Sequence, residues 1–278
     1  MHTRTLLWMK QRLLLFFLFL QFGLGAQENY PVGARQAALA NAAVTLTDVW
    51  SAHHNQAGLG HIRHLTAGVY YENRFLIPEL GLAAAAIAIP VSQGSFGISI
   101  RNFGYKLYQE SKIGLGYGRK FGENLSIGMQ LNYHQVRIAD IYGNKSLFTA
   151  EVGALYQLGK NLVAAAHVYN PGQPRLSEFG DERLPAAIRF GLRYQFSEKI
   201  MLATEAEKGS YHNPMLRLAM EYRILGILSL RAGISSNPVN SSFGFGIHAK
   251  KLLMDFAGAY HPVLGLSPKL ALTYAFGE

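Results

Sequence analysis

The stretch Ile188-Arg189-Phe190-Gly191-Leu192-Arg193-Tyr194-Gln195-Phe196 decides the fold class of this chain. Large apolar side chains occupy every even position, while arginine, glycine or glutamine occupies every odd position. Successive side chains of a β-strand point to opposite faces, so this stretch predicts a strand with one apolar and one polar face. The same alternation returns at 125–134, 216–223 and 228–232. The chain is therefore predicted to be all-β.

The chain begins with a pattern typical of an export signal. Arg4, Lys10 and Arg12 accompany an apolar run over 13–22, and Gly25-Ala26 provides a small-residue cleavage site. The run is too short to span a bilayer as a helix, so residues 1–26 are predicted to be a cleaved signal peptide. An uncleaved anchor is the alternative. The sequence contains no cysteine, which excludes a lipoprotein anchor and a disulfide framework.

The composition fits a membrane barrel better than a nucleic-acid-binding protein. The chain has 29 glycines, 15 tyrosines and 16 phenylalanines, and only 15% of its residues are charged. After the signal, no apolar stretch is long enough for a transmembrane helix. The formal charge is +9, of which the signal supplies three, and the remaining excess is spread along the chain. Because no basic patch is visible, nucleic acid is not expected as a partner.

Segments with a period of two residues number fourteen, an even count typical of bacterial outer-membrane barrels. Short connections such as 197–199 alternate with longer ones such as 140–145 and 170–185. This predicts an antiparallel up-and-down transmembrane barrel over 63–278, located in the outer membrane with its apolar face against lipid; a soluble β-sandwich is the alternative. The predicted strands are 64–73, 79–90, 93–103, 107–119, 124–137, 146–158, 161–170, 186–197, 199–208, 214–224, 226–235, 241–250, 251–261 and 266–276.

The polar face of these strands carries charges of both signs. If the apolar face contacts lipid, the charged face lines the lumen, where arginines and carboxylates on neighbouring strands can pair. The sequence thus predicts a lumenal charge network. Its members are Arg101, Glu151, Arg189, Arg193, Glu205, Glu207, Arg217, Glu221, Arg223, Arg231 and Asp255, with His248 on the same face.

Residues 27–62 do not follow the strand pattern. The region is rich in alanine, and Asp48 is placed to cap a helix that begins near Trp50. Small residues let backbones approach closely, so the region is interpreted as an N-terminal plug folded into the lumen. A periplasmic tail is the alternative, although a tail would not need so many small apolar residues.

This region and the C-terminus resemble a known family. Gly33-Ala34-Arg35, an acidic turn at Asp48, and Asn55-Gln56-Ala57-Gly58-Leu59 resemble the opening of the FadL-like outer-membrane barrels. The likeness is greatest to the PorV/PorQ branch of Bacteroidota, although Gln56 stands where that branch usually has proline. The stretches 254–265 and 272–277 also resemble that branch.

The resemblance implies a fourteen-stranded barrel with an N-terminal plug. It further implies a plugged scaffold or accessory protein associated with type IX secretion, with a secretion-system or surface-protein partner. The alternative is a FadL-like conduit for a small hydrophobic ligand, for which Leu155, Val163 and Leu253 on the inward face are candidate lining residues.

No catalytic, cofactor-binding or metal site is predicted. His53, His54, His61 and His64 gather near the plug, but their spacing matches no metal motif, and polar lining of the lumen is the expected role. No Gly-x-Ser-x-Gly motif is present, and the other histidines lie on separate strands. The chain is therefore predicted to be non-enzymatic and to need no cofactor.

Overall fold

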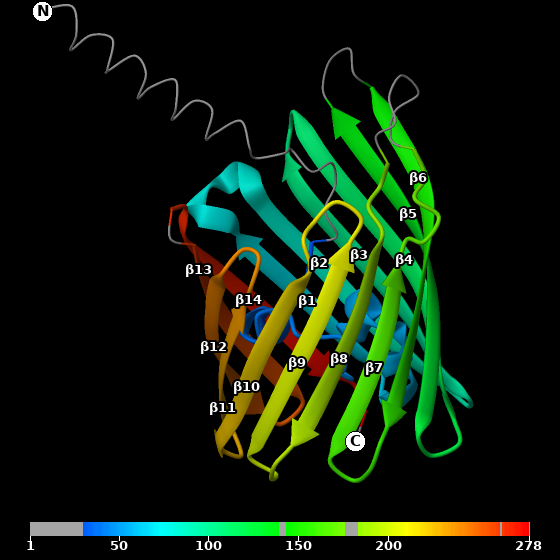
Figure 1. Ribbon diagram of the computed structural model, residues 1–278, viewed down its shortest axis with the longest axis vertical. Coiled ribbons are helices and arrows are strands. Elements are labelled where there is room, and N and C mark those ends of the chain that lie inside the picture. The colour runs from blue at the N-terminus through cyan, green and yellow to red at the C-terminus, as the bar shows by residue number, and fades with distance from the viewer. Residues whose placement is uncertain (1–29, 139–142, 176–182, 262, 278) are drawn as a thin grey trace, which may run out of the picture.

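The computed structural model describes residues 30–138, 143–175, 183–261 and 263–277; the predicted signal peptide, 1–26, lies outside them. The strands form one closed ring (Figure 1). Every strand pairs antiparallel with its neighbours in sequence, and β1 closes the ring against β14. The predicted all-β, up-and-down barrel is confirmed.

Fourteen strands make up this ring, as the alternation predicts, and no boundary differs from its predicted position by more than two residues. They are β1 (Thr66–Asn73), β2 (Gly81–Val91), β3 (Gly94–Tyr105), β4 (Tyr108–Phe121), β5 (Leu125–Ile138), β6 (Asn144–Gln157), β7 (Leu162–Tyr169), β8 (Ala187–Gln195), β9 (Ile200–Gly209), β10 (Met215–Leu225), β11 (Leu228–Ser235), β12 (Asn240–Ala249), β13 (Leu252–His261) and β14 (Gly265–Ala275).

The apolar face of the strands points out of the barrel. On β8, Phe190 is 54% exposed and Leu192 is 45% exposed, whereas Arg189 between the alternating apolar residues is only 6% exposed. A soluble sandwich would bury the apolar face in its core. The barrel instead presents a belt of large apolar side chains outward, as a lipid-facing wall does.

The two ends of the barrel differ. Six tight turns, the start of β1 and the end of β14 share one end, here called the turn end, which is at the bottom of Figure 1. The opposite end, the loop end, carries η2 (Arg74–Leu76) and η3 (Pro78–Leu80) between β1 and β2. The predicted loops 140–145 and 170–185 belong to this end, but part of each lies outside the described residues.

Residues 30–62, here called the lumenal segment, lie inside the ring (blue in Figure 1). The segment contains α2 (Ala34–Ala38), α3 (Ser51–His54) and the 3₁₀ helix η1 (Gln56–His61). Helix α2 contacts β11 to β14, α3 contacts β2 and β3, and η1 contacts β3 to β6. Across the described ranges, no helix has the length and apolar character needed to cross a membrane.

Glycines on the inward face make room for the segment. A side chain at Gly128 would overlap the backbone of Gln56, and one at Gly153 would overlap the Asn55 amide. The absence of a Cβ therefore allows strand and segment backbones to approach closely. The inward glycines that meet the segment in this way are Gly97, Gly118, Gly128, Gly153, Gly191, Gly233 and Gly244.

Replacing Leu192 with arginine tests the outward register. We expect a loss of about 2–4 kcal/mol in the free energy of unfolding in liposomes if Leu192 lies near the bilayer midplane. The matched change Val239→Arg, in the exposed connection between β11 and β12 at the loop end, should cost only about 0–1 kcal/mol. Urea titration followed by tryptophan fluorescence measures both, and equal costs at the two positions would show that Leu192 does not face lipid.

Candidate functional site

One charge cluster joins the lumenal segment to strands β10, β11 and β13. Arg35 donates to Glu221 through Nε at 2.8 Å and through a second guanidinium nitrogen at 3.0 Å, and to Asp48 at 3.1 Å. Arg231 donates to the same Glu221 and to Asp255, each at 2.6 Å. Two guanidinium groups and three carboxylates thus alternate, and each charge has an opposite partner.

The conformation of the segment places Arg35 in this cluster. Gly33 adopts a φ of 94° immediately before α2, and a Cβ there would overlap the side chain of Gln36. Gln36 donates to both carboxylate oxygens of Asp48, and Asp48 also accepts from the backbone N–H of Trp50. Asp48 therefore holds Trp50 beside α2. Trp50, and not Asp48, is the N-cap residue of α3, and no side chain caps that helix, so the expected capping role of Asp48 is wrong.

Glu205 on β9 anchors the middle of the segment. Its Oε2 accepts from the backbone N–H groups of Ala43 and Val44, both at 2.8 Å, and its Oε1 accepts from Arg217 at 2.7 Å. Arg217 also donates to Glu207 at 3.0 Å. The Glu205 side chain is fully buried, whereas that of Glu207 is 27% exposed. Of these two carboxylates, only Glu205 holds the segment.

A second charge cluster surrounds Glu151 on β6. Lys112 donates to Glu151 Oε1, and Gln56 of the segment donates to Oε2 at 3.2 Å. Arg189 donates to His167 Nδ1 at 2.8 Å and to the His54 carbonyl oxygen at 2.8 Å. Because Nδ1 of His167 accepts, Nε2 carries the proton, and it lies 3.1 Å from Glu151 Oε2. The cluster thus fixes one tautomer of a neutral imidazole.

The opposite wall of the lumen is largely apolar where it meets the segment. A continuous group of buried side chains lies between the segment and strands β1, β2, β3, β13 and β14. It begins near the loop end with Tyr30, Leu80 and Phe103 and ends near the turn end with Leu59 and Ile62. This group, here called the apolar seam, comprises Val32, Ala34, Ala37, Ala38, Val49, Trp50, Ala52, Leu59, Tyr70, Leu82, Ala84, Ala86, Ala88, Phe103, Ala257 and Ala271, with Tyr30, Ile62, Leu80 and Tyr108 packed against it.

Other residues proposed from the sequence lie outside these clusters. Arg101 is buried on β3 and donates to the Tyr30 carbonyl oxygen at 3.1 Å. Arg193 is half-buried on β8, and Arg223 is exposed near the end of β10. His248 lies on β12 beside Ser229. The two charge clusters and the Glu205 group thus contain Glu151, Arg189, Glu205, Glu207, Arg217, Glu221, Arg231 and Asp255.

The three residues that the sequence suggested as the lining of a conduit do not lie on one continuous surface. Leu155 and Val163 are buried against Val44 and Ala57 of the segment, away from the apolar seam. Leu253 is half-buried near the turn end of β13. A path along the inward face would therefore follow the apolar seam, which the sequence alone did not indicate.

The motif Asn55 to Leu59 is the contact region of η1. Asn55 caps the helix by accepting from the Ala57 N–H, and it donates to the carbonyl oxygens of Val44 and Ala154. Position 58 requires glycine because the chain packs closely there: a Cβ would lie 2.7 Å from the Leu46 carbonyl oxygen. Gln56 supplies a side-chain donor to Glu151, a contact that proline could not make.

The histidines of the segment act as neutral hydrogen-bonding groups. Burial, with the nearby positive charge of Arg189, lowers the pKa of His54 to about 3, and its Nε2 lies 2.7 Å from the Val32 carbonyl oxygen. Burial, with Lys120 as the next cause, lowers the pKa of His61 to about 4. His53 contacts the Ala85 carbonyl oxygen. In the part of the chain that the structure describes, no group of three or more His, Asp or Glu side chains could hold a metal ion.

Several lumenal residues were missed by the sequence reasoning. Lys112, Asn132 and His167 complete the Glu151 cluster, and Lys269 pairs with Glu72 at 3.3 Å near the loop end. Lys112 could have been found, because it lies between Glu110 and Gly114 in an inward series of alternate positions, with Ile113 and Leu115 outward. The other members lack such a signal, since single polar residues in strands are common.

Comparison with known proteins identifies the fold. No protein-family model and no curated protein matches the sequence. Among solved structures, the Ralstonia pickettii toluene transporter TbuX is similar over 88% of this chain and 98% of its own, with a TM-score of 0.71 and 10% identity. The Pseudomonas putida toluene transporter TodX is similar over 90% and 100%, with a TM-score of 0.71 and 11% identity.

A Pseudomonas aeruginosa FadL homologue is similar over 89% of this chain and 99% of its own, with a TM-score of 0.68 and 13% identity. Each similarity extends over nearly the whole of the solved chain. The protein therefore has the fold of the FadL-type outer-membrane barrels, as the resemblance at its two ends implies.

Proposed function

We propose that this barrel lies in the outer membrane and passes small hydrophobic molecules across it along the apolar seam. The carrying observation is the seam itself, which extends from Phe103 near the loop end to Leu59 near the turn end. Apolar solutes leave water most readily for an apolar surface, so a continuous apolar track favours their passage over that of ions. The function is transport and requires no catalysis.

Two further observations support the proposal. The buried ion pairs lie mainly on the β4 to β6 and β8 to β13 side and anchor the segment there. On the seam side, by contrast, the segment packs largely through alanines and Trp50. Among the described residues, its bonds to β2 and β3 are single hydrogen bonds to or from carbonyl oxygens, made by His53, Ser95 and Arg101. The segment can therefore separate from β1 to β3 more easily than from the charged wall. The FadL-type fold, which TbuX and TodX share as toluene transporters, agrees with this substrate class.

A reversible disulfide between the segment and β3, which would hold the apolar seam closed, tests the proposal. A Cβ built at Gly97 lies 3.2 Å from Cβ of Ala52, just below the about 3.5–4.5 Å of a disulfide. The chain has no native cysteine, so Ala52→Cys/Gly97→Cys introduces the only two thiols. Cells that make the oxidised variant should take up radiolabelled toluene at the rate of cells without the barrel, and a reductant should restore uptake.

The single-cysteine variants are the controls, since any side chain that replaces Gly97 crowds Leu59 whether or not a disulfide forms. They should take up toluene at the same rate with and without reductant. Wild-type uptake no greater than that of cells lacking the barrel would refute the conduit. Uptake by the wild type that the disulfide leaves unchanged would place the path away from the seam.

A scaffold role of the PorV/PorQ type in type IX secretion is the second candidate. The observation that favours it is the filling of the lumen by the segment and by buried ion pairs, which suits a sealed barrel. Chemical cross-linking in intact outer membranes distinguishes the candidates. A scaffold should be recovered with secretion-system or surface proteins, and its removal should lower surface display of cargo without changing toluene uptake.

A further inference from the structure

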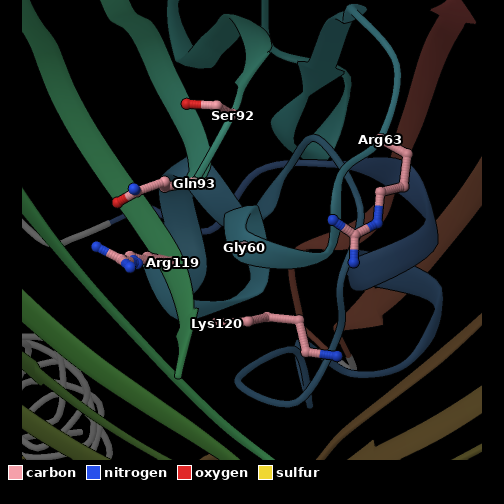
Figure 2. A pocket seen from close by; sticks show the side chains of 7 residues that line it. Gly60, Arg63, Ser92, Gln93, Arg119 and Lys120 are labelled. Atoms are coloured by element: carbon pink, nitrogen blue, oxygen red, sulfur yellow. The ribbon is translucent and has the colours of Figure 1, made fainter. Parts of the chain in front are cut away.

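A basic pocket at the turn end belongs to neither the apolar seam nor the charge clusters. It is an open pocket of about 280 Å³, lined by Gly60, Arg63, Ser92, Gln93, Gly94, Arg119 and Lys120 (Figure 2). Three lining residues are cationic, and none is a carboxylate. None of the three cations forms an ion pair with a carboxylate of the described residues. Like charges gathered without a counter-charge repel one another, and a bound anion relieves that repulsion.

The pocket crosses the rim of the barrel wall. Arg119 and Lys120 leave β4 on opposite sides (Figure 2). Lys120 is on the lumenal face, together with Gly118, which contacts the segment, and Arg63 follows the end of η1. Arg119 is on the lipid-facing side, where its guanidinium lies 5.3 Å from the ring centre of Phe121. An anion at the rim can therefore be approached by cations from both sides of the wall.

Apolar surface adjoins the pocket on the lipid-facing side. The ring of Tyr117 packs against that of Phe96, with centres 5.0 Å apart, and Phe96 is 43% exposed. The Tyr117 hydroxyl lies beside Gly94 of the pocket, because a Cβ at Gly94 would lie 2.8 Å from it. Val91, also outward and exposed, ends the neighbouring strand β2. Aromatic and aliphatic side chains directly beside a basic pocket match a ligand that has an anionic head and apolar tails.

We propose that the turn-end pocket binds the phosphoryl head group of a phospholipid in the periplasm-facing leaflet, with the acyl chains against Phe96 and Tyr117. Arg63 and Lys120 hold the phosphoryl oxygens from the lumenal side, and Arg119 holds them from the lipid side. The pKa of His61 is lowered first by burial and then by nearby positive charges, Lys120 and Arg63 among them. This lowering fits a positive electrostatic potential at the pocket. The inference rests on the proposed membrane location, but not on the passage of any hydrophobic molecule.

Native mass spectrometry of the detergent-purified full chain, titrated with phosphatidylglycerol, tests the proposal. The variant Arg63→Ala/Lys120→Ala should bind the lipid about 25-fold more weakly, since each basic residue near an anionic head group contributes about a factor of five. The pair Lys160→Ala/Lys199→Ala, in the turns after β6 and β8 at the same end, removes the same charge and should change binding less than about twofold. Equal losses from the two pairs would overturn the proposal, because diffuse charge would then explain the binding.

Two further measurements complete the test: competition with phosphate identifies the ligand, and a single variant replaces the double variant if that variant does not fold. Millimolar inorganic phosphate should leave the lipid bound, because phosphate lacks the chains that contact Phe96. Displacement of the lipid would instead assign the pocket to free phosphate and overturn the lipid assignment. If the double variant fails to fold, the single change Arg63→Gln, outside every strand, should still weaken binding about fivefold. Failure of toluene uptake would refute the conduit and leave this binding result unaffected.

Discussion

A variant that lacks residues 33–60 is expected to conduct ions through planar bilayers at least about ten times better than the full-length protein, because side chains alone cannot fill a barrel of this strand number. The lumenal segment occupies that space in the wild type and is almost entirely buried. Without it, water replaces the segment beside Glu205 and Glu221. Single-channel recording measures the difference, and the full-length protein should conduct little.

The deletion needs a folding control and a second variant. Folded barrels migrate faster on gels unheated than boiled, so the deletion must retain that shift before its conductance is interpreted. Arg35→Glu removes no chain, but it places a third carboxylate beside Glu221 and Asp48 and should loosen α2 by repulsion. A folded deletion variant that conducts no better than the wild type would show that the segment does not close the pore.

The second large effect is expected at Glu205. The change Glu205→Leu should lower the free energy of unfolding by about 3–5 kcal/mol, because it leaves the buried Arg217 with only the partly exposed Glu207 as a counter-charge. It also leaves the N–H groups of Ala43 and Val44 without their acceptor. Urea titration in liposomes measures the loss.

Glu207→Leu is the matched control. It is on the same strand and binds the same arginine, but its side chain is 27% exposed and forms no hydrogen bond with the described residues of the segment. Its loss should cost no more than about 1 kcal/mol, as for other exposed ion pairs. If the two variants lose equal stability, burial and segment contact do not set the strength of this network.

The sequence predicted the strands well because the relevant signal is local. In the stretch from Ile188 to Phe196, each side chain's face follows from its place in a two-residue period, whichever strand lies beside it. That period gave fourteen strands within two residues of their observed bounds, and it assigned Leu192 outward and Arg189 inward. The outward face could be assigned to lipid because large apolar and aromatic residues occupy it.

The pairing of residues within the lumen could not be predicted, because it depends on contacts between residues that are distant in the sequence. Arg35 and Glu221 are separated by 186 positions in the sequence. They meet only because α2 packs inside the closed ring against β11 to β14. The alternation likewise placed Arg223 on the inward face with Arg217, yet Arg223 is exposed because it lies near the strand end. How deep a residue lies in the lumen depends on how the strands are arranged in the closed ring, and the alternation does not specify this.

The sequence by itself determined that this chain forms a barrel with an apolar outside and a charged inside. Only the tertiary structure decided that the inside has two unlike walls, with ion pairs around Glu151 and Glu221 and an apolar seam along β1 to β3. The physical reason is that alternation specifies the face of each side chain, whereas the path of the segment through the lumen specifies its neighbours. That path is set by inward glycines such as Gly128 and Gly153, whose missing side chains leave the space that the segment occupies.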